Sequence, residues 1–585
     1  MFRPLASVRH KVPGLAHALA RHLPRARALT SHLPRARALT SHLPQARALA
    51  RRVRHQVRLP QQARLTGRLR LPQKPPPLQK VRLPQTVSGP AWGRVLAIMA
   101  AAGCALLGAV VAAGDGSALD HATSLPPGPS TLPVTTSATP GTSAPATPAA
   151  RTPVPAPPAS AFCQQSFRLA CYSPRQIARA YDLLPLYAQG LNGRGRTIVI
   201  VDSFGSPTIR HDLRVFDSGF GLPGPPSLRV LQPVGKVPAY DAHNQDMVDA
   251  AAETTTDVEA AHAMAPGASI LLVETPAAET LTGGGFAQFV AAENYVIAHH
   301  LGDVISQSFG IPEQNFPSRA ALLKLRYAYF SARQQHVTVL AATNDFGVTG
   351  PTRSGGMFRT QPVVDWPASD PLVTAVGGTS LRLNAAGTRI SPDTAWNESG
   401  NAAVARYAGA LPWASSGGRS AIFARPSYQD PVRAVVGSHR GIPDVALSAS
   451  FSGSSLTFES FTGAPGTWKV AAGTSVATPY FAGIVAIADQ ALHTRLGLLN
   501  PALYQLEQDR APGIVTVTKG SNTVSFAQGR KTITVGGYPA RRGYNLVTGV
   551  GTIDAGAFIR DLRALRTPLC PPAGQDDQGR AACGT

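Results

Sequence analysis

Short apolar runs rich in β-branched residues alternate with helical stretches through the middle of this chain, and this alternation constrains the fold most. The run RTIVIVD at 196–202 has an apolar centre and is soon followed by Gly and Pro. Such a run is typical of a strand buried on both faces of a sheet. Strands that alternate with helices predict an α/β domain with a largely parallel sheet. Further apolar runs lie at 269–273, 303–307, 337–341 and 372–376, with helical stretches at 287–299 and 319–334.

The formal charge of +23 is concentrated at the start of the chain. Residues 1–94 hold 20 of the 55 Lys and Arg residues and no Asp or Glu, which leaves 35 basic residues against 32 acidic ones elsewhere. The rest of the 585-residue chain is therefore nearly neutral, at +3. A charge confined to one segment does not predict a nucleic-acid-binding domain. We expect no specific nucleic acid partner.

Residues 1–94 form a basic tail of low complexity. A ten-residue repeat begins at 21, 31 and 41, as RHLPRARALT, SHLPRARALT and SHLPQARALA. The Pro in each repeat prevents a continuous helix. The composition predicts a disordered segment attracted to anionic lipid or nucleic acid. An alternative is a translated extension without a role.

An uncharged run of 20 residues, 95–114, follows the tail. At ~1.5 Å per residue it spans roughly 30 Å of bilayer. Basic residues flank only its N-terminal side, which predicts a cytoplasmic N-terminus and export of everything after Asp115. The alternative is a cleaved signal peptide, which would release the protein into the medium. Residues 115–160, rich in Pro, Thr, Ser and Ala, then predict a disordered linker.

The cysteines agree with export. Cys163 with Cys171 and Cys570 with Cys583 form two local pairs that bracket the predicted domain at 161–585. An even number of cysteines in an exported chain favours disulfides. Metal binding is the alternative, but neither pair has the Cys-x-x-Cys spacing of zinc sites.

The run Gly-Thr-Ser-Val-Ala-Thr-Pro at 473–479 predicts a nucleophilic serine. The run leads into an apolar helix at 481–488, so Ser475 would lie at a helix start. Backbone N–H groups and the positive end of the helix dipole favour a developing oxyanion there. A serine hydroxyl is a weak nucleophile until a neighbouring base accepts its proton.

Carboxylates are the better candidates for that base. Glu253 and Asp257 would share one face of a helix within 252–268. Two carboxyls held close repel, so one keeps its proton to higher pH. A solvated helix face is the plain alternative. His262 fits a packing role better than a catalytic one, and Asp202, at the end of the first strand, is interpreted as structural.

These motifs together resemble those of the sedolisins, or serine-carboxyl peptidases, over roughly 181–558. The resemblance rests on Glu-x-x-x-Asp at 253–257, Ala-Thr-Asn-Asp-Phe-Gly at 342–347 and the Gly-Thr-Ser run. Their joint order is more specific than any one motif. Supporting matches lie at 305–310 (ISQSFG), 366–369 (WPAS), 375–379 (AVGGT), 415–420 (SSGGRS) and 499–504 (LNPALY).

The resemblance implies a subtilisin-like fold and peptide-bond hydrolysis through an acyl-enzyme on Ser475. Glu253 would be the general base and then the acid, Asp257 its partner, and Asp345 the side chain of the oxyanion hole. A turn-capping Asp is the alternative for Asp345. It also implies a role in substrate binding for three residues, Ser306, Ser308 and Gly310.

A carboxylate base has a reference pKa of about 4, and Asp345 donates a hydrogen bond only when protonated. Activity is therefore expected at acid pH, about pH 3–5, unless burial raises these pKa values.

The chain departs from the sedolisin pattern in two places. Members of the family usually bind calcium through an Asp-led Asp-[Val/Ile]-Thr-x-Gly-x-Asn segment and a later Gly-Tyr-Asp. Thr516 and Asn545 replace the two carboxylates here, and calcium affinity follows the number of charged oxygen ligands. We expect no required cofactor and at most weak calcium binding. Family members also carry a large folded propeptide, and none is recognisable before Cys163.

The sequence therefore predicts an exported, membrane-tethered, acid-active serine endopeptidase that acts as a monomer on polypeptides. Two alternatives stay open: an exopeptidase of the same fold that releases tripeptides, and a catalytically silent binding scaffold.

Overall fold

The computed structural model describes residues 156–463 and 465–566, and all structural statements below concern these residues. The predicted tail, the 95–114 segment, nearly all of the linker and the Cys570–Cys583 pair lie outside them. No helix within the described part of the chain is both long and apolar enough to cross a bilayer.

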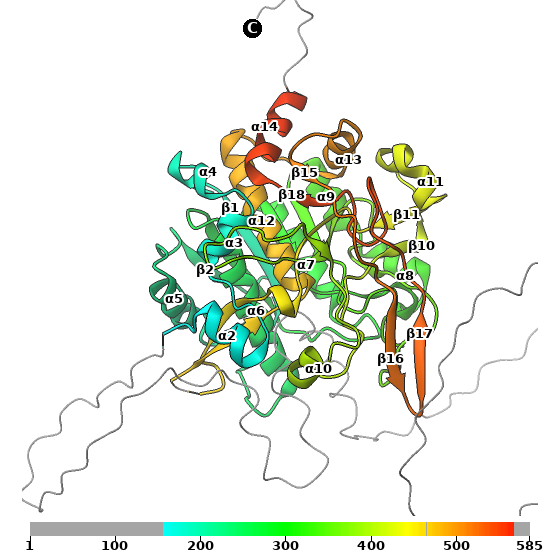
Figure 1. Cartoon of the computed structure of the whole chain (residues 1–585), viewed down its shortest axis with the longest axis horizontal. Helices are drawn as coiled ribbons and strands as arrows, with labels where there is room; N and C mark the ends of the chain where they lie inside the picture. The colour runs from blue at the N-terminus through cyan, green and yellow to red at the C-terminus, as the bar shows by residue number, and fades with distance from the viewer. Residues whose placement is uncertain (1–155, 464, 567–585) are drawn as a thin grey trace, which may run out of the picture. The chain divides into compact units, whose positions relative to one another are not determined.

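An eight-stranded sheet forms the centre of the fold (Figure 1). Its strand order is β12-β8-β6-β4-β1-β3-β2, and every neighbouring pair in this order is parallel. The short β9 pairs antiparallel with β8. The predicted α/β domain with a mostly parallel sheet is confirmed. The strands are β1 (Thr197–Ser203), β2 (Leu228–Leu231), β3 (Ser269–Thr275), β4 (Val304–Gln307), β6 (Thr338–Ala342), β8 (Thr374–Ser380), β9 (Thr394–Ala395) and β12 (Val445–Ser448).

Burial explains why the apolar runs become these strands. Residues 198–202 of β1 are all buried, and β4 and β6 are buried throughout. A central parallel strand is covered on both faces, so it needs apolar side chains at every position. The pairing of Asp202 with Glu274 and of Ile200 with Ser306 fixes the register of β1 between β3 and β4.

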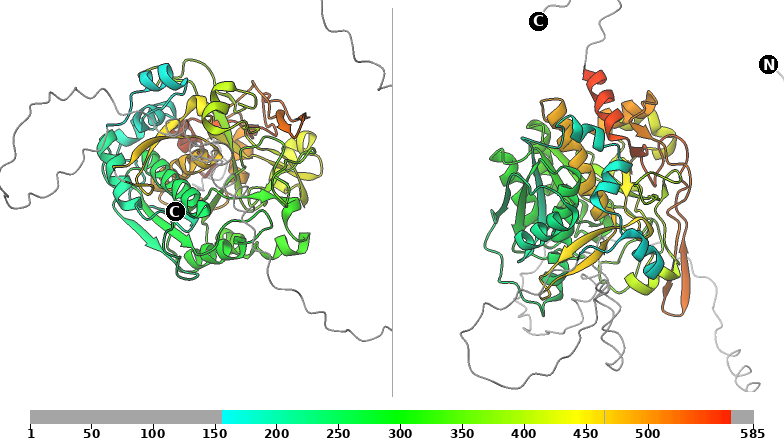
Figure 2. Two further views of the ribbon diagram at one scale, coloured as in Figure 1. Left: turned by 90° about the horizontal axis from the view of Figure 1, so that it is seen from below. Right: turned by 60° about the vertical axis from the view of Figure 1, so that its left-hand side comes forward.

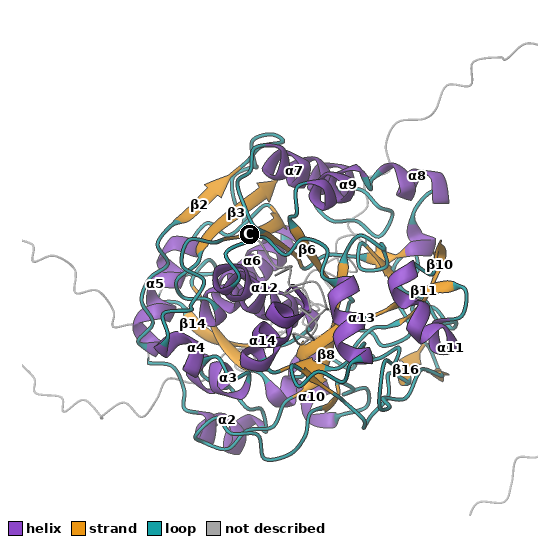
Figure 3. Ribbon diagram, turned by 90° about the horizontal axis from the view of Figure 1, so that it is seen from above, coloured by secondary structure: helices purple, strands orange, loops and turns teal. Residues whose placement is uncertain are grey.

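Helices cover both faces of the sheet, as Figure 3 shows. Helices α7 (Phe286–Ala298) and α9 (Tyr327–Gln334) pack together on one face, and α6 (Gln245–Met264) and α12 (Thr474–Ala491) on the other. The stretch predicted to be helical at 319–334 forms two helices, because α8 (Arg319–Lys324) ends before α9 begins. Arg326, between them, donates two hydrogen bonds to Asp370, at 2.6 and 2.9 Å.

The close approach of α6 and α12 positions the candidate site. A Cβ atom at Gly483 of α12 would lie 2.5 Å from the Cβ of Met264 on α6. Glycine therefore lets the two backbones come together. Nearly every residue of both helices is buried, as expected of helices in the centre of a large core.

The remaining elements surround this core (Figures 1 and 2). Five two-stranded antiparallel sheets and several short helices connect the main elements of the described chain, and the main apolar core draws on residues from Cys163 to Leu562. The bounds are α2 (Ser160–Phe167), α3 (Pro174–Ala180), α4 (Leu184–Ala188), α5 (Ile209–Phe220), α10 (Ala402–Ala408), α11 (Arg433–Val436), α13 (Asn500–Gln508), α14 (Ala555–Arg566), β5 (Ile311–Pro312), β7 (Asp365–Trp366), β10 (Gly418–Ala424), β11 (His439–Ile442), β13 (Ser455–Glu459), β14 (Thr467–Ala471), β15 (Ile514–Val515), β16 (Val524–Gln528), β17 (Lys531–Val535), β18 (Thr552–Ile553), and the 3₁₀ helices η2 (Glu313–Asn315), η3 (Ser427–Val432) and η4 (Phe451–Gly453).

Candidate active site

Ser475 lies in the first turn of α12, as the sequence predicts. The preceding Gly473 has φ 110°, a backbone conformation that side chains disfavour, so glycine is needed at this turn. The first N–H groups of a helix have no partner within the helix. The N–H of Ser475 belongs to this turn and is therefore available to a negatively charged oxygen.

Pro479, four residues beyond Ser475, also shapes the site. Proline has no N–H and cannot bond to the carbonyl oxygen one turn before it. The carbonyl oxygen of Ser475 is thus left without its helical partner. The hydroxyl of Ser308 lies 3.5 Å from that oxygen and 2.9 Å from Oδ1 of Asp257, to which it donates a hydrogen bond. Ser308 therefore connects the nucleophile's helix to the carboxyl pair.

Glu253 and Asp257 are one turn apart on α6 and are both buried. The Ser475 hydroxyl is close enough to favour the ionised form of Glu253, although neither oxygen of Glu253 makes a hydrogen bond of good geometry. Hydrogen bonds between a nucleophile and its base are often long in the absence of substrate. The structure thus brings together the predicted nucleophile and base.

Burial dominates the electrostatics of this pair. Loss of solvation raises the pKa of Glu253 well above its ordinary value, and the negative charge of Asp257 raises it further. Burial likewise raises the pKa of Asp257, with Asp202 as the next contributor. Among the described residues no Lys, Arg or His forms an ion pair with Glu253 or Asp257. As the pH rises, the two interacting carboxyls lose their protons in two steps that belong to the pair and not to either residue alone.

Asp345 follows the carboxyl end of β6 and faces the start of α12. The N–H and the hydroxyl of Thr474 both donate to Oδ1 of Asp345, each at 2.8 Å. Burial raises the pKa of Asp345 to about 7, and the two bonds from Thr474 act in the opposite direction. Asp345 is therefore a protonated acid at acid pH, which can donate a hydrogen bond to an oxygen that gains negative charge.

Comparisons with known proteins agree with this geometry. The model of the subtilase family matches residues 235–530. The chain belongs to the subtilase family. Its fold is that of the sedolisins: the solved structure of Pseudomonas sedolisin, a serine-carboxyl proteinase complexed with pseudo-iodotyrostatin, matches with a TM-score of 0.56 and 25% identity over 68% of this chain and 99% of that one. The predicted resemblance is confirmed.

Two curated relatives extend the comparison. Kumamolisin of Bacillus sp. (strain MN-32) is 31% identical over 396 residues, 66% of this chain and 63% of that protein. Human tripeptidyl-peptidase 1 is 29% identical over 275 residues, 45% of this subtilase and 43% of that protein. This subtilase therefore spans less than two thirds of the length of the curated relatives it matches.

Asp202 and His262 occupy the places expected of structural residues in this subtilase. Asp202 is buried at the end of β1, where its charge raises the pKa of Asp257. His262, fully buried near the end of α6, lies 2.9 Å from the carbonyl oxygen of Pro223 and 3.1 Å from Asp217. These contacts of its Nε2 fit a packing role for His262 near the end of α6.

The three predicted substrate-binding residues have different surroundings. Ser308 borders the carboxyl pair, as described above. Ser306 is fully buried within β4, and its hydroxyl has no hydrogen-bond partner. The N–H of Gly310 donates to Glu279 at 3.0 Å, and its carbonyl oxygen accepts from Asn344 at 3.2 Å. Their role in binding stays a prediction.

At one of the two positions where the calcium carboxylates are replaced, the side-chain amide of Asn545 makes hydrogen bonds to its own loop. The Nδ2 group of Asn545 donates to the carbonyl oxygens of Arg541 and Gly543, at 3.2 and 3.4 Å, and its Oδ1 accepts from the N–H of Thr548 at 3.0 Å. Both carbonyl oxygens therefore already accept hydrogen bonds from the Asn545 amide. Thr516 is exposed, and the neighbouring Lys519 and Arg541 are basic. These residues do not fit a tightly bound calcium ion, and no group of three or more His, Cys, Asp or Glu in the described segments is placed to hold a metal.

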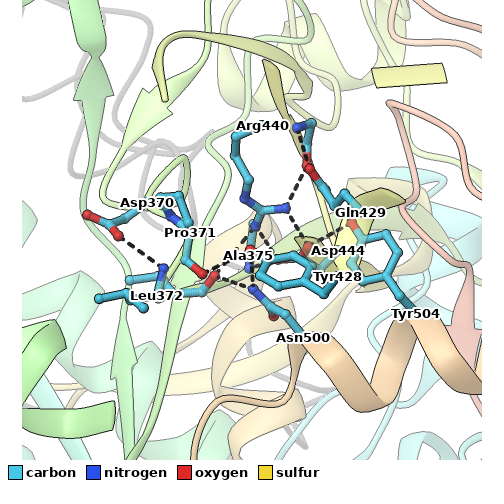
Figure 4. Close-up of polar contacts among 12 residues, drawn as sticks. Asp370, Pro371, Leu372, Ala375, Tyr428, Gln429, Arg440, Asp444, Asn500 and Tyr504 are labelled. Atoms are coloured by element: carbon cyan, nitrogen blue, oxygen red, sulfur yellow. Dashed lines mark hydrogen bonds and ion pairs between the residues drawn. The ribbon is translucent and has the colours of Figure 1, made fainter. Parts of the chain in front are cut away.

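A pocket of about 490 Å³ lies elsewhere, beside α13 and η3. Tyr428 and Tyr504 line it, over a buried ion pair of Arg440 and Asp444 (Figure 4). None of the predicted catalytic residues lines this pocket. It lies beside Leu372, just before β8, whereas Asp345 follows the opposite, carboxyl end of β6. We therefore assign the chemistry to the carboxyl edge of the sheet.

Two residues that the sequence did not single out support the site. Thr474 bonds to Asp345, and Asn344 donates from its N–H to the hydroxyl of Thr474 at 3.1 Å. Both residues lie within motifs that carried the resemblance, directly before Ser475 and Asp345. Their position next to predicted site residues was the available signal.

A disulfide joins Cys163 to Cys171 at the end of α2.

Proposed function

We propose that this subtilase is an acid-active serine-carboxyl endopeptidase that cleaves peptide bonds through an acyl-enzyme on Ser475. The observation that carries the proposal is a buried carboxyl pair without a cation, next to a serine at a helix start. Burial gives Glu253 a raised pKa, which makes it a stronger base for the serine proton than an exposed carboxylate would be.

The first half-reaction forms the ester. Oγ of Ser475 attacks the carbonyl carbon of the substrate while its proton passes to Glu253. The electron pair of the C=O bond moves to the oxygen, which accepts hydrogen bonds from the N–H of Ser475 and the protonated Asp345. Glu253 then gives its proton to the leaving nitrogen as the C–N bond breaks, and the acyl group stays on Oγ.

The second half-reaction releases the product. Water attacks the ester carbon and gives its proton to Glu253. As the bond to Oγ breaks, that proton returns to Ser475, and a carboxylic acid leaves. The negative charge of Asp257 raises the pKa of Glu253 and so strengthens it as a base, and Asp257 is itself held by Ser308.

The experiment compares the full chain with Ser475→Ala and Glu253→Ala on a denatured protein between pH 2.5 and 8. Cleavage confined to acid pH, and lost in both variants, would support the proposal. A folded wild-type chain that cleaves at no pH would overturn it and favour a silent scaffold.

An exopeptidase that removes tripeptides is the second candidate, because one matching relative is named for that activity. Internally quenched peptides with free and with blocked amino termini separate the two. Equal cleavage of both supports the endopeptidase, whereas cleavage of the free peptide alone supports the exopeptidase.

We also propose that the enzyme works outside the cytoplasm, tethered through residues 95–114 or released after cleavage there. The disulfide at Cys163 and Cys171 is compatible with an oxidising compartment. Addition of a protease or a non-permeant amine-reactive reagent to intact cells tests this: a cell-associated domain that stays unlabelled and protected would contradict export.

A further inference from the structure

Thr474 makes two hydrogen bonds to one atom of Asp345. Its backbone N–H and its hydroxyl both donate to Oδ1, each at 2.8 Å, and both residues are almost completely buried. No hydrogen bond to Oδ2 comes from the described residues. The two oxygens of this carboxyl group are therefore in different surroundings.

The chemistry of a carboxylic acid makes this difference consequential. A protonated carboxyl has one oxygen that only accepts and one that carries the proton. An oxygen that already accepts two hydrogen bonds is the acceptor, so the proton resides on Oδ2. The bonds from Thr474 thus determine which oxygen can donate.

The orientation of the Thr474 hydroxyl is itself fixed. Its oxygen accepts a hydrogen bond from the N–H of Asn344 at 3.1 Å, so its own proton is directed to Asp345. Asn344 has φ 80°, an uncommon value outside glycine. Its Nδ2 group is anchored by Asp365 at 2.6 Å and by the carbonyl oxygen of Gly310 at 3.2 Å.

We propose that Thr474 is a positioning residue that holds Oδ1 of Asp345 as an acceptor, so that Oδ2 presents its proton to the substrate oxygen as that oxygen becomes negative. The inference rests on the proposed function and deepens it. It assigns to the threonine before the nucleophile a part in oxyanion stabilisation that its position in the motif alone does not show.

A change in pH dependence follows. Both bonds from Thr474 lower the pKa of Asp345, while burial raises it to about 7. Two other acids act electrostatically with Asp345, Glu253 from α6 and Asp365 from β7. Removal of the hydroxyl leaves these acids in place and removes one bond to the ionised form. The pKa of Asp345 should then rise, and the alkaline limit of activity with it.

The test uses Thr474→Val, which keeps the shape and the N–H but lacks the hydroxyl, and Thr474→Ser, which keeps the hydroxyl. Steady-state kinetics of the full chain are measured across pH with a quenched peptide. In Thr474→Val we expect kcat to fall about 10- to 100-fold, less than the ~10²–10³ for loss of a whole oxyanion donor. KM should change little, and the alkaline limit should move to higher pH. Thr474→Ser should retain both values within about threefold.

Other outcomes overturn the inference. These are a Thr474→Val enzyme with unchanged kcat and pH limit, or a Thr474→Ser enzyme as impaired as Thr474→Val. If Thr474→Val does not fold, Thr474→Ala replaces it. Failure of both to fold beside a folded Thr474→Ser would assign the hydroxyl to stability alone. An inactive wild-type chain, or an active Ser475→Ala, would instead overturn the proposed function, so the two failures are distinguishable.

Discussion

The fold buries carboxyl groups in two contrasting ways. Asp444, fully buried just before β12, accepts hydrogen bonds from Arg440, from the hydroxyl of Tyr504 at 2.9 Å and from the N–H of Ala375 at 2.8 Å (Figure 4). Glu253 is buried as well, but its oxygens make no good hydrogen bond and face a second acid. Asp444 thus has an ion-pair partner and several hydrogen-bond donors, whereas Glu253 has no ion-pair partner among the described residues.

Within one core, a buried carboxyl group can serve stability at one site and proton transfer at another. A buried ion must be matched by an opposite charge and by hydrogen bonds. At Asp444 the chain supplies both. At Glu253 the described part of the chain supplies no opposite charge and only the nearby hydroxyl of Ser475, so burial disfavours the ionised form and raises the pKa. An unpaired acid is costly for folding but suited to proton transfer.

Of the substitutions considered, Glu253→Gln should have the largest effect. We expect kcat to fall by about 10²–10⁴, since the general base is lost. The thermal midpoint at pH 7 should not fall, because an unpaired acid becomes a neutral amide. Kinetics and calorimetry of the full chain measure both. An active Gln variant would show that another group accepts the serine proton.

Replacement of Arg440 by Met should have the opposite signature. It leaves Asp444 buried without its cation, which typically costs about 3–5 kcal/mol of unfolding free energy. Activity per folded molecule should be retained. Denaturant unfolding measures the loss, and the double variant Arg440→Met with Asp444→Leu is the control that should recover part of it. A single variant as stable as the wild type would mean that the ion pair contributes little.

The stability of the fold should decrease as the pH rises from about 4 to 7. Burial raises the pKa of Asp202, Asp249 and Asp345 to about 7. The unfolded chain loses these protons near pH 4, whereas the folded chain still holds them, so deprotonation favours unfolding across this window.

Asp249→Asn isolates one of these groups away from the proposed mechanism. The variant should lose about 1–3 kcal/mol less than the wild type between pH 4 and 7. The exposed Asp430→Asn serves as the matched control. A wild-type chain whose midpoint increases over this interval would contradict the expected sign.

Much of the fold could be predicted from local sequence because its causes are local. Apolar runs gave β1, β3, β4 and β6 within two residues, whereas β8 continues four residues beyond its predicted run. The short edge strand β2 was missed, since only intermediate burial marks it. The split between α8 and α9 was missed because Arg326 turns to Asp370, 44 positions away.

The candidate site likewise has residues that local sequence could predict and contacts that it could not. Ser475, Glu253 and Asp257 could be named because each lies in a motif with its own chemistry. The tie from Thr474 to Asp345 spans 129 positions and depends on how two loops meet. No spacing rule encodes such a contact.

The smallest expected effect concerns Asn545. The wild-type midpoint should be the same in millimolar calcium and in chelator, because the amide already occupies the carbonyl oxygens. Asn545→Asp should destabilise the loop by about 1 kcal/mol, and calcium, but not magnesium, should restore part of that loss. A wild-type midpoint that drops in chelator would show that calcium binds.

The disulfide between Cys163 and Cys171 has a mechanical consequence. It joins two cysteines that are eight positions apart, and Tyr172 just beyond it is held by the carbonyl oxygen of Ser454 and by the N–H of Leu383. A tensile load applied through residue 156 would be borne by a covalent clamp and these anchors before it reached the sheet. A pull from the N-terminal side would therefore load these contacts before it loaded the helix that carries Ser475.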